Sequence, residues 1–66
     1  MDNKYIELVN NIYNNIDNFL QNDLFKMYIK NSENIIEKYI QLYPDLTYHQ
    51  VLSIYLGVTF YIYNNI

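Results

Sequence analysis

Apolar residues recur every three or four positions along residues 3–21, which is the spacing of an amphipathic helix. Placed at about 100° per residue, they share one arc of about 160°. The apolar residues of this arc are Tyr5, Ile6, Leu8, Val9, Ile12, Tyr13, Ile16, Phe19 and Leu20. The charged residues and asparagines lie outside the arc, and Asp2 or Asn3 can cap its start. We therefore predict a surface helix with one buried face.

A second amphipathic pattern covers residues 23–43, after a polar break in which Asn22 or Asp23 can cap the next helix. Its apolar residues share another arc of about 160° if the helix is continuous. They are Leu24, Phe25, Tyr28, Ile29, Ile35, Ile36, Tyr39, Ile40, Leu42 and Tyr43. Met27 alone points away from this arc, and Ser32 lies within it. The preserved phase predicts one continuous helix, with a kink near Ser32 as the alternative.

The third pattern covers residues 48–64 and has the best-marked start in the chain. Pro44 cannot continue the preceding helix. Thr47 and Gln50 have the spacing of a capping box, in which each side chain bonds a backbone amide of the other residue. We predict a helix here. The alternative is a strand at residues 58–63, which are rich in β-branched and aromatic side chains.

Short connections join the three segments, and such connections between helices produce antiparallel neighbours. We therefore predict an all-α fold, a small up-down-up three-helix bundle with helices at residues 3–21, 23–43 and 48–64. Residues 1–66 form a single domain, near the lower size limit for a self-sufficient core. The chain has no cysteine to form disulfides, so it depends on tight packing or on association.

The third predicted helix carries more apolar surface than two neighbours can bury. Its apolar side chains span about 260°, whereas an arc of about 160° is enough for a helix that packs on one side. The most coherent contact stripe on it is Ser53, Leu56, Gly57, Phe60, Tyr63 and Asn64. We expect this stripe to mediate association, either as a symmetric homodimer or with another protein. The alternative is that aromatic side chains of the first two helices cover it.

Composition narrows the possible partners. Seven acidic residues against four lysines give a net charge of −3, and the absence of arginine argues against nucleic-acid binding. The longest nearly apolar run, residues 51–63, is shorter than the roughly 20 residues that span a bilayer. The N-terminal residues do not have the pattern of a signal peptide. We therefore expect no membrane span and a cytoplasmic location, including the cytoplasm of a host cell.

The residue types needed for catalysis or metal binding are sparse. His49 is the only histidine, Gly57 is the only glycine, and no cysteine is present, so neither a nucleophilic triad nor a phosphate-binding loop can be built. Glu33 and Glu37 form an acidic pair on a polar face without further ligands. We expect no enzymatic activity, no cofactor, no metal and no small-molecule substrate.

A short motif lies between the second and third predicted helices. It reads Tyr43-Pro44-Asp45-Leu46 and is followed by Val51 and Leu52. Through these residues, the segment 36–66 resembles a CUE domain, which is a small three-helix ubiquitin-binding fold. That family has a Phe-Pro motif at the position of Tyr43-Pro44. The resemblance implies that Tyr43 and Pro44 contact ubiquitin. The chain departs from the family near its end, where Tyr61-Ile62-Tyr63 replaces a pair of leucines.

These observations favour a small, non-enzymatic protein–protein interaction module that forms a homodimer. Asn occurs 11 times, Ile 10 times and Tyr 9 times, and these residues have A/T-rich codons, which indicates an A/T-rich virus, phage or mobile element. In that setting, we expect the protein to bind a host protein and to inhibit or regulate it. The alternatives are a minor structural or virion subunit and the CUE-like ubiquitin-binding domain.

Overall fold

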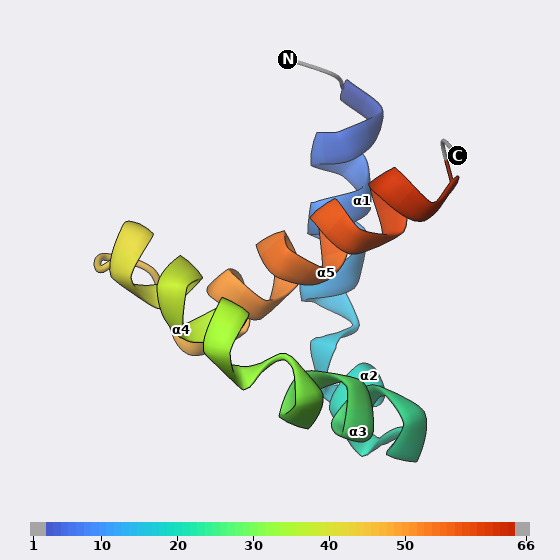
Figure 1. Cartoon of the computed structure of the whole chain (residues 1–66). Coiled ribbons are helices and arrows are strands. Elements are labelled where there is room, and N and C mark those ends of the chain that lie inside the picture. The colour runs from blue at the N-terminus through green and yellow to red at the C-terminus, as the bar shows by residue number, and fades with distance from the viewer. Residues whose placement is uncertain (1–2, 65–66) are drawn as a thin grey trace.

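The computed structural model describes residues 3–64, which form five α-helices (Figure 1). They are α1 (Asn3–Asn14), α2 (Ile16–Gln21), α3 (Asp23–Asn31), α4 (Glu33–Leu42) and α5 (Tyr48–Asn64). No strand occurs in this part of the chain, so the predicted all-α class is confirmed. The alternative of a strand at residues 58–63 is wrong, because α5 runs through them. Within residues 3–64, no helix combines the length and the apolar character needed to cross a bilayer.

The first predicted helix is divided at Asn15, so the prediction of one helix over residues 3–21 is wrong. Asn15 has φ −117° and ψ 18°, outside the helical region. Its backbone amide donates to the carbonyl of Ile12 at 3.1 Å, and its side-chain amide donates to the carbonyl of Asn11 at 2.9 Å. Asparagine competes for backbone hydrogen bonds in this way, which explains why the regular ladder ends here.

The second predicted helix is divided at Ser32, where α4 turns away from α3 (Figure 1). Ser32 has φ −105° and ψ 12°, and its amide donates to the carbonyl of Ile29 at 3.1 Å. The prediction of one helix over residues 23–43 is therefore wrong, and the alternative of a kink near Ser32 is confirmed. A single residue with ψ near zero bends the axis but keeps the rotation close to helical. The apolar phase consequently survives the break.

Side-chain caps fix the starts of two helices as predicted. The Asn22 side-chain oxygen accepts from the amides of Leu24 at 2.9 Å and Phe25 at 3.3 Å, which identifies the cap of α3. At α5, the Gln50 amide donates to the Thr47 hydroxyl at 3.2 Å, and the Thr47 amide donates to the Gln50 side chain at 2.8 Å. The predicted capping box is confirmed in both halves.

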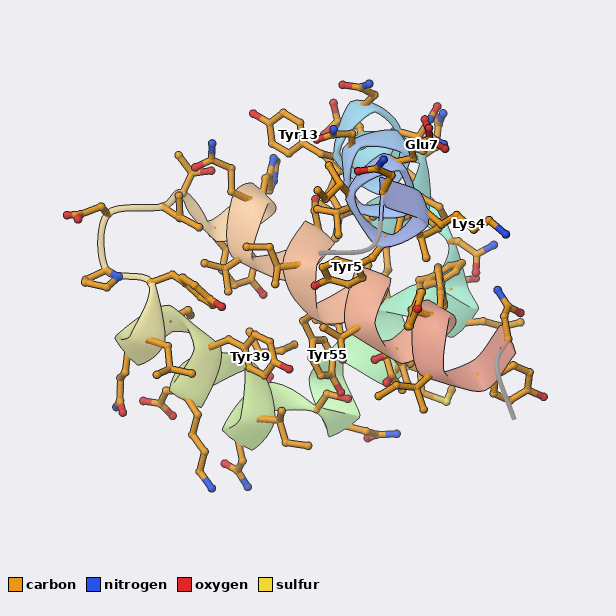
Figure 2. All side chains as sticks on the ribbon, turned by 90° about the horizontal axis from the view of Figure 1, so that it is seen from above. Lys4, Tyr5, Glu7, Tyr13, Tyr39 and Tyr55 are labelled. Carbon is orange, nitrogen blue, oxygen red and sulfur yellow. The ribbon has the colours of Figure 1, made fainter. Side chains whose placement is uncertain are left out.

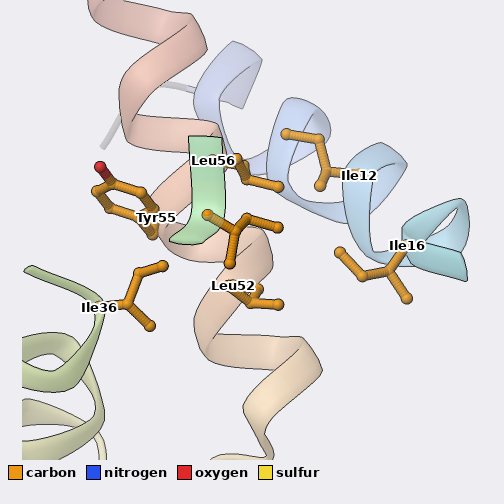
Figure 3. Close-up of a cluster of buried hydrophobic side chains, with 7 residues drawn as sticks. Ile12, Ile16, Ile36, Leu52, Tyr55 and Leu56 are labelled. Atoms are coloured by element: carbon orange, nitrogen blue, oxygen red, sulfur yellow. The ribbon is translucent and has the colours of Figure 1, made fainter. Parts of the chain in front are cut away.

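Helix α5 occupies the centre of the molecule, with α1 on one side and α4 on another (Figures 1 and 2). It crosses α1 steeply, as both views show, so the predicted three-helix up-down-up arrangement is not confirmed. The buried apolar cluster draws on every helix (Figure 3). Its members are Ile12, Ile16, Ile29, Ile36, Leu52, Tyr55 and Leu56.

The contact between α1 and α5 requires a glycine on α5. A Cβ atom placed on Gly57 would lie 2.5 Å from Cγ2 of Val9, which is closer than van der Waals contact allows. Gly57 therefore permits the close approach of α1. Ser53, one turn earlier on α5, is also buried and donates its hydroxyl to the carbonyl of His49 at 2.7 Å.

Candidate docking groove between α3 and α5

The contact stripe predicted on α5 needs correction, because its first half is inside the molecule. Ser53, Leu56 and Gly57 are buried in the chain's own core. Phe60 is partly buried, whereas Tyr63 and Asn64 are exposed. Side chains of the earlier helices cover this part of α5, and at Gly57 the covering side chain is Val9 of α1 and not one of the aromatic residues that the alternative interpretation named. Only the C-terminal part of the stripe remains at the surface.

Three phenylalanines cover the middle of that stripe and join α2, α3 and α5. The ring of Phe19 lies 4.8 Å from Phe25 and 6.4 Å from Phe60, measured between centroids. Phe25 lies 5.8 Å from Phe60 in an edge-to-face arrangement. Such geometry adds to the free energy gained from burial alone, by about 0.5–1.5 kcal/mol per pair. Phe25 and Phe60 also form part of the wall of an open groove.

This groove has a volume of about 390 Å³ and lies between α3 and the C-terminal half of α5. It is lined by Asn22, Leu24, Phe25, Tyr28, Thr59, Phe60 and Tyr63. None of these side chains is ionised at neutral pH. Leu24 is 76% exposed and Tyr63 is 77% exposed, so both stand out beside the hollow. Met27 on α3 is 61% exposed and extends the apolar surface beyond Leu24.

Hydroxyl groups connect two of the lining residues to the core. The Tyr28 hydroxyl lies 3.1 Å from both the Tyr55 hydroxyl and the Thr59 hydroxyl. The Thr59 hydroxyl donates to the carbonyl of Tyr55 at 3.0 Å. The Tyr55 ring is stacked on Tyr28 and meets Tyr39 edge-to-face, between α4 and α5 (Figure 2). The polar atoms beside the groove are therefore held in place by contacts to three helices.

Burial raises the pKa of the Tyr55 phenol above its ordinary value of 10.0. A hydrogen bond from Ser32 acts in the opposite direction, and the hydrogen bond to Tyr28 raises the pKa further. The Tyr55 side chain is consequently neutral over the physiological range, as its place in a hydroxyl network requires.

A smaller hollow of about 180 Å³ lies against α1, between that helix and α5. It is lined by Tyr5, Ile6, Val9, Asn10, Tyr43 and Ile54. Burial raises the pKa of Tyr5, and the nearby phenols of Tyr39 and Tyr43 add to the increase. The Tyr5 ring also packs edge-to-face on Tyr61 at 5.7 Å (Tyr5 is labelled in Figure 2). This hollow has about half the volume of the α3–α5 groove. None of its large hydrophobic lining residues is as exposed as Leu24 and Tyr63 are at that groove.

The α3–α5 groove is suited to apolar contact. Its lining has no carboxylate, imidazole or amine that could transfer a proton at neutral pH. In the part of the chain that the structure describes, no three side chains of His, Cys, Asp or Glu are close enough to hold a metal ion. His49, Glu33 and Glu37 are all exposed.

Sequence reasoning missed the contribution of α3 to this surface. Leu24 belongs to the predicted apolar arc of the second helix, but the structure leaves it largely exposed. The one available signal was Met27, which points away from the predicted buried face. A single exposed apolar side chain is normal on a protein surface, so Met27 alone could not have identified the groove.

Comparison of the chain with protein-family models, with curated proteins and with solved structures found no match in any of the three. The structure places Tyr43 and Pro44, the residues of the CUE-like motif, in the exposed connection between α4 and α5.

Proposed function

We propose that the protein is a non-enzymatic protein–protein interaction module that forms a homodimer through the α3–α5 groove. The observation that supports this proposal is the combination of an uncharged apolar hollow with protruding apolar side chains at its edge. A twofold symmetric interface uses the same patch on both copies, so the patch must complement itself. A surface that presents both projections and a hollow meets this requirement.

Charge does not oppose a second copy of the chain as the occupant of the groove. The chain has a net charge of −3, so two copies repel each other through most of their surfaces. No lining residue of the groove carries a charge, so association there brings no like charges into direct contact. A self-contact through the groove therefore avoids the main electrostatic cost of dimerisation.

The exposed apolar surface around Leu24, Met27 and Tyr63 amounts to a few hundred Å² on each copy, which is the scale of a functional patch. Its burial contributes about 25 cal/mol per Å² before the costs of association are subtracted. The patch is smaller than the roughly 800 Å² per partner of a standard interface. We therefore expect a weak dimer, with a dissociation constant in the micromolar range, or about −8 kcal/mol.

Leu24→Asp tests the proposal, and Leu42→Asp is its matched control. Leu24 lines the groove, whereas Leu42 is 70% exposed at the end of α4 and is not among the lining residues. We expect the unmodified protein to sediment as a dimer at about 100 µM, well above a micromolar dissociation constant. Leu24→Asp should be monomeric with unchanged helix content, and Leu42→Asp should remain dimeric. A monomeric unmodified protein, or equal effects of the two substitutions, would contradict the proposal.

A second apolar surface supports a second candidate function, that of a subunit in a larger assembly. Leu42, Tyr43, Leu46 and Tyr48 are all exposed around the connection between α4 and α5. A dimer that carries this additional surface could contact a different protein, including a host protein if the source is a virus.

A titration with ubiquitin followed by NMR tests the CUE-like alternative, since the resonances of Tyr43 and its neighbours should shift. Unchanged resonances would exclude ubiquitin as that partner.

A further inference from the structure

The hydroxyl groups beside the groove can share their hydrogens in only one way that satisfies all of the observed contacts. A carbonyl only accepts, so the Thr59 hydroxyl must donate its single hydrogen to the carbonyl of Tyr55. The Tyr28 hydroxyl must then donate to Thr59. With the Tyr28 hydrogen used, the contact between the two phenols requires Tyr55 to donate to Tyr28.

The order of donation is therefore Tyr55 to Tyr28, Tyr28 to Thr59, and Thr59 to the backbone carbonyl of Tyr55. Among residues 3–64, no buried side-chain nitrogen or oxygen lacks a hydrogen-bond partner, which agrees with this order.

This order determines what the network can offer to a molecule in the groove. Each hydroxyl oxygen has two lone pairs, and Tyr28 and Thr59 each accept only one hydrogen within the network. Their hydrogens are all used, so these two residues can accept a further hydrogen bond and cannot donate one. An occupant whose polar atom is an acceptor would leave buried groups unpaired, which costs more than the loss of an ordinary hydrogen bond.

We infer that Tyr63 of a second copy enters the groove and donates its phenolic hydrogen to the Tyr28–Thr59 pair. This inference rests on the proposed homodimer. Among residues 3–64, Tyr63 is the most exposed of the large apolar and aromatic residues, and it combines an apolar ring with a hydrogen-bond donor. It also lines its own groove, so a twofold axis at that place brings each Tyr63 to the hollow of the other copy.

Tyr63→Phe tests the inference, because it keeps the ring and removes the donor. We expect the dissociation constant of the dimer to rise about three- to tenfold, the range for one hydrogen bond. Tyr13→Phe removes an exposed hydroxyl on α1, away from the groove, and should leave the constant unchanged. In a Tyr28→Phe/Thr59→Val background, where both acceptor hydroxyls are lost, the effect of Tyr63→Phe should disappear.

The outcomes separate the inference from the proposal on which it rests. If the unmodified protein is a monomer, both fail. If it is a dimer and Tyr63→Phe leaves the dissociation constant unchanged, the proposed homodimer stands and the role of the Tyr63 hydroxyl is refuted. If Tyr63→Phe weakens the dimer equally with and without the Tyr28→Phe/Thr59→Val pair of substitutions, the Tyr63 hydroxyl bonds elsewhere and the inference is also refuted. Sedimentation equilibrium across a concentration series measures all of these constants.

Discussion

Replacement of Gly57 by alanine is the sharpest test of how α1 and α5 pack. Gly57 lies in the interior of α5, where glycine is about 1 kcal/mol less favourable than alanine. In an exposed helix, the substitution would therefore stabilise the protein. Here the added Cβ atom would lie 2.5 Å from Cγ2 of Val9 on α1. One of the two helices, or the Val9 side chain, must move to accommodate it.

Neither adjustment is easy. Valine in a helix has one strongly preferred side-chain rotamer, so rotation of Val9 away from the new methyl group is unfavourable. Separation of the helices would loosen the contact between α1 and α5. Overpacking of this kind costs about 1–3 kcal/mol. After the gain in helix propensity, we expect Gly57→Ala to lower the free energy of unfolding by about 1 kcal/mol, or about 4–8 °C in melting temperature for a domain of this size.

In a Val9→Ala background, Gly57→Ala should change the free energy of unfolding in the opposite direction. Cβ of Val9 is 3.6 Å from the position of the new Cβ atom, an ordinary van der Waals distance, so only the Val9 methyl group clashes. Without that methyl group, Gly57→Ala should raise the free energy of unfolding by about 1 kcal/mol. Urea denaturation of the four proteins in this cycle measures the coupling. If Gly57→Ala is stabilising with Val9 intact, α1 does not approach α5 as the structure shows.

Two further predictions concern a helix start and the buried phenols. Thr47→Ala should lower the free energy of unfolding by about 1 kcal/mol through loss of the capping box, whereas Thr47→Ser, which keeps the hydroxyl bonded to the Gln50 amide, should cost much less in urea denaturation. Because the pKa values of Tyr5 and Tyr55 are raised in the folded state, their contribution to stability is complete below pH 10.0 and declines as the pH rises above it. Tyr55→Phe should therefore flatten the fall in stability above pH 10.0, and an unchanged profile would refute the burial effect.

The sequence predicts the helix starts well because local side chains determine them. Asn22 and the pair of Thr47 and Gln50 form the expected caps, and α5 runs over residues 48–64 as predicted. Such caps depend on residues two or three positions apart, so their geometry is present in the sequence pattern itself. The same locality explains the correct all-α assignment, since helical periodicity extends through most of the chain.

The two helix breaks were harder to predict, because the periodicity of apolar residues reports how the residues are rotated about the helix axis. It does not report the direction of that axis. Asn15 and Ser32 each depart from helical geometry at a single residue. The apolar residues on both sides therefore keep their phase while the axis changes direction. Asparagine is frequent in this chain, so Asn15 could not be distinguished from its neighbours. At Ser32, only a small polar residue within an apolar arc indicated the kink.

The breaks also explain why the predicted contact stripe on α5 lies mostly inside the protein. Two straight helices packed beside α5 would leave part of its surface uncovered. The predicted contact stripe assumed this arrangement. The bends at Asn15 and Ser32 divide each companion into two helices that approach α5 from different directions (Figure 1). Phe19 on α2 and Phe25 on α3 then reach Phe60, which a straight pair of helices need not do. The apolar surface left over is consequently shifted towards α3, which is why the proposed dimer contact includes Leu24.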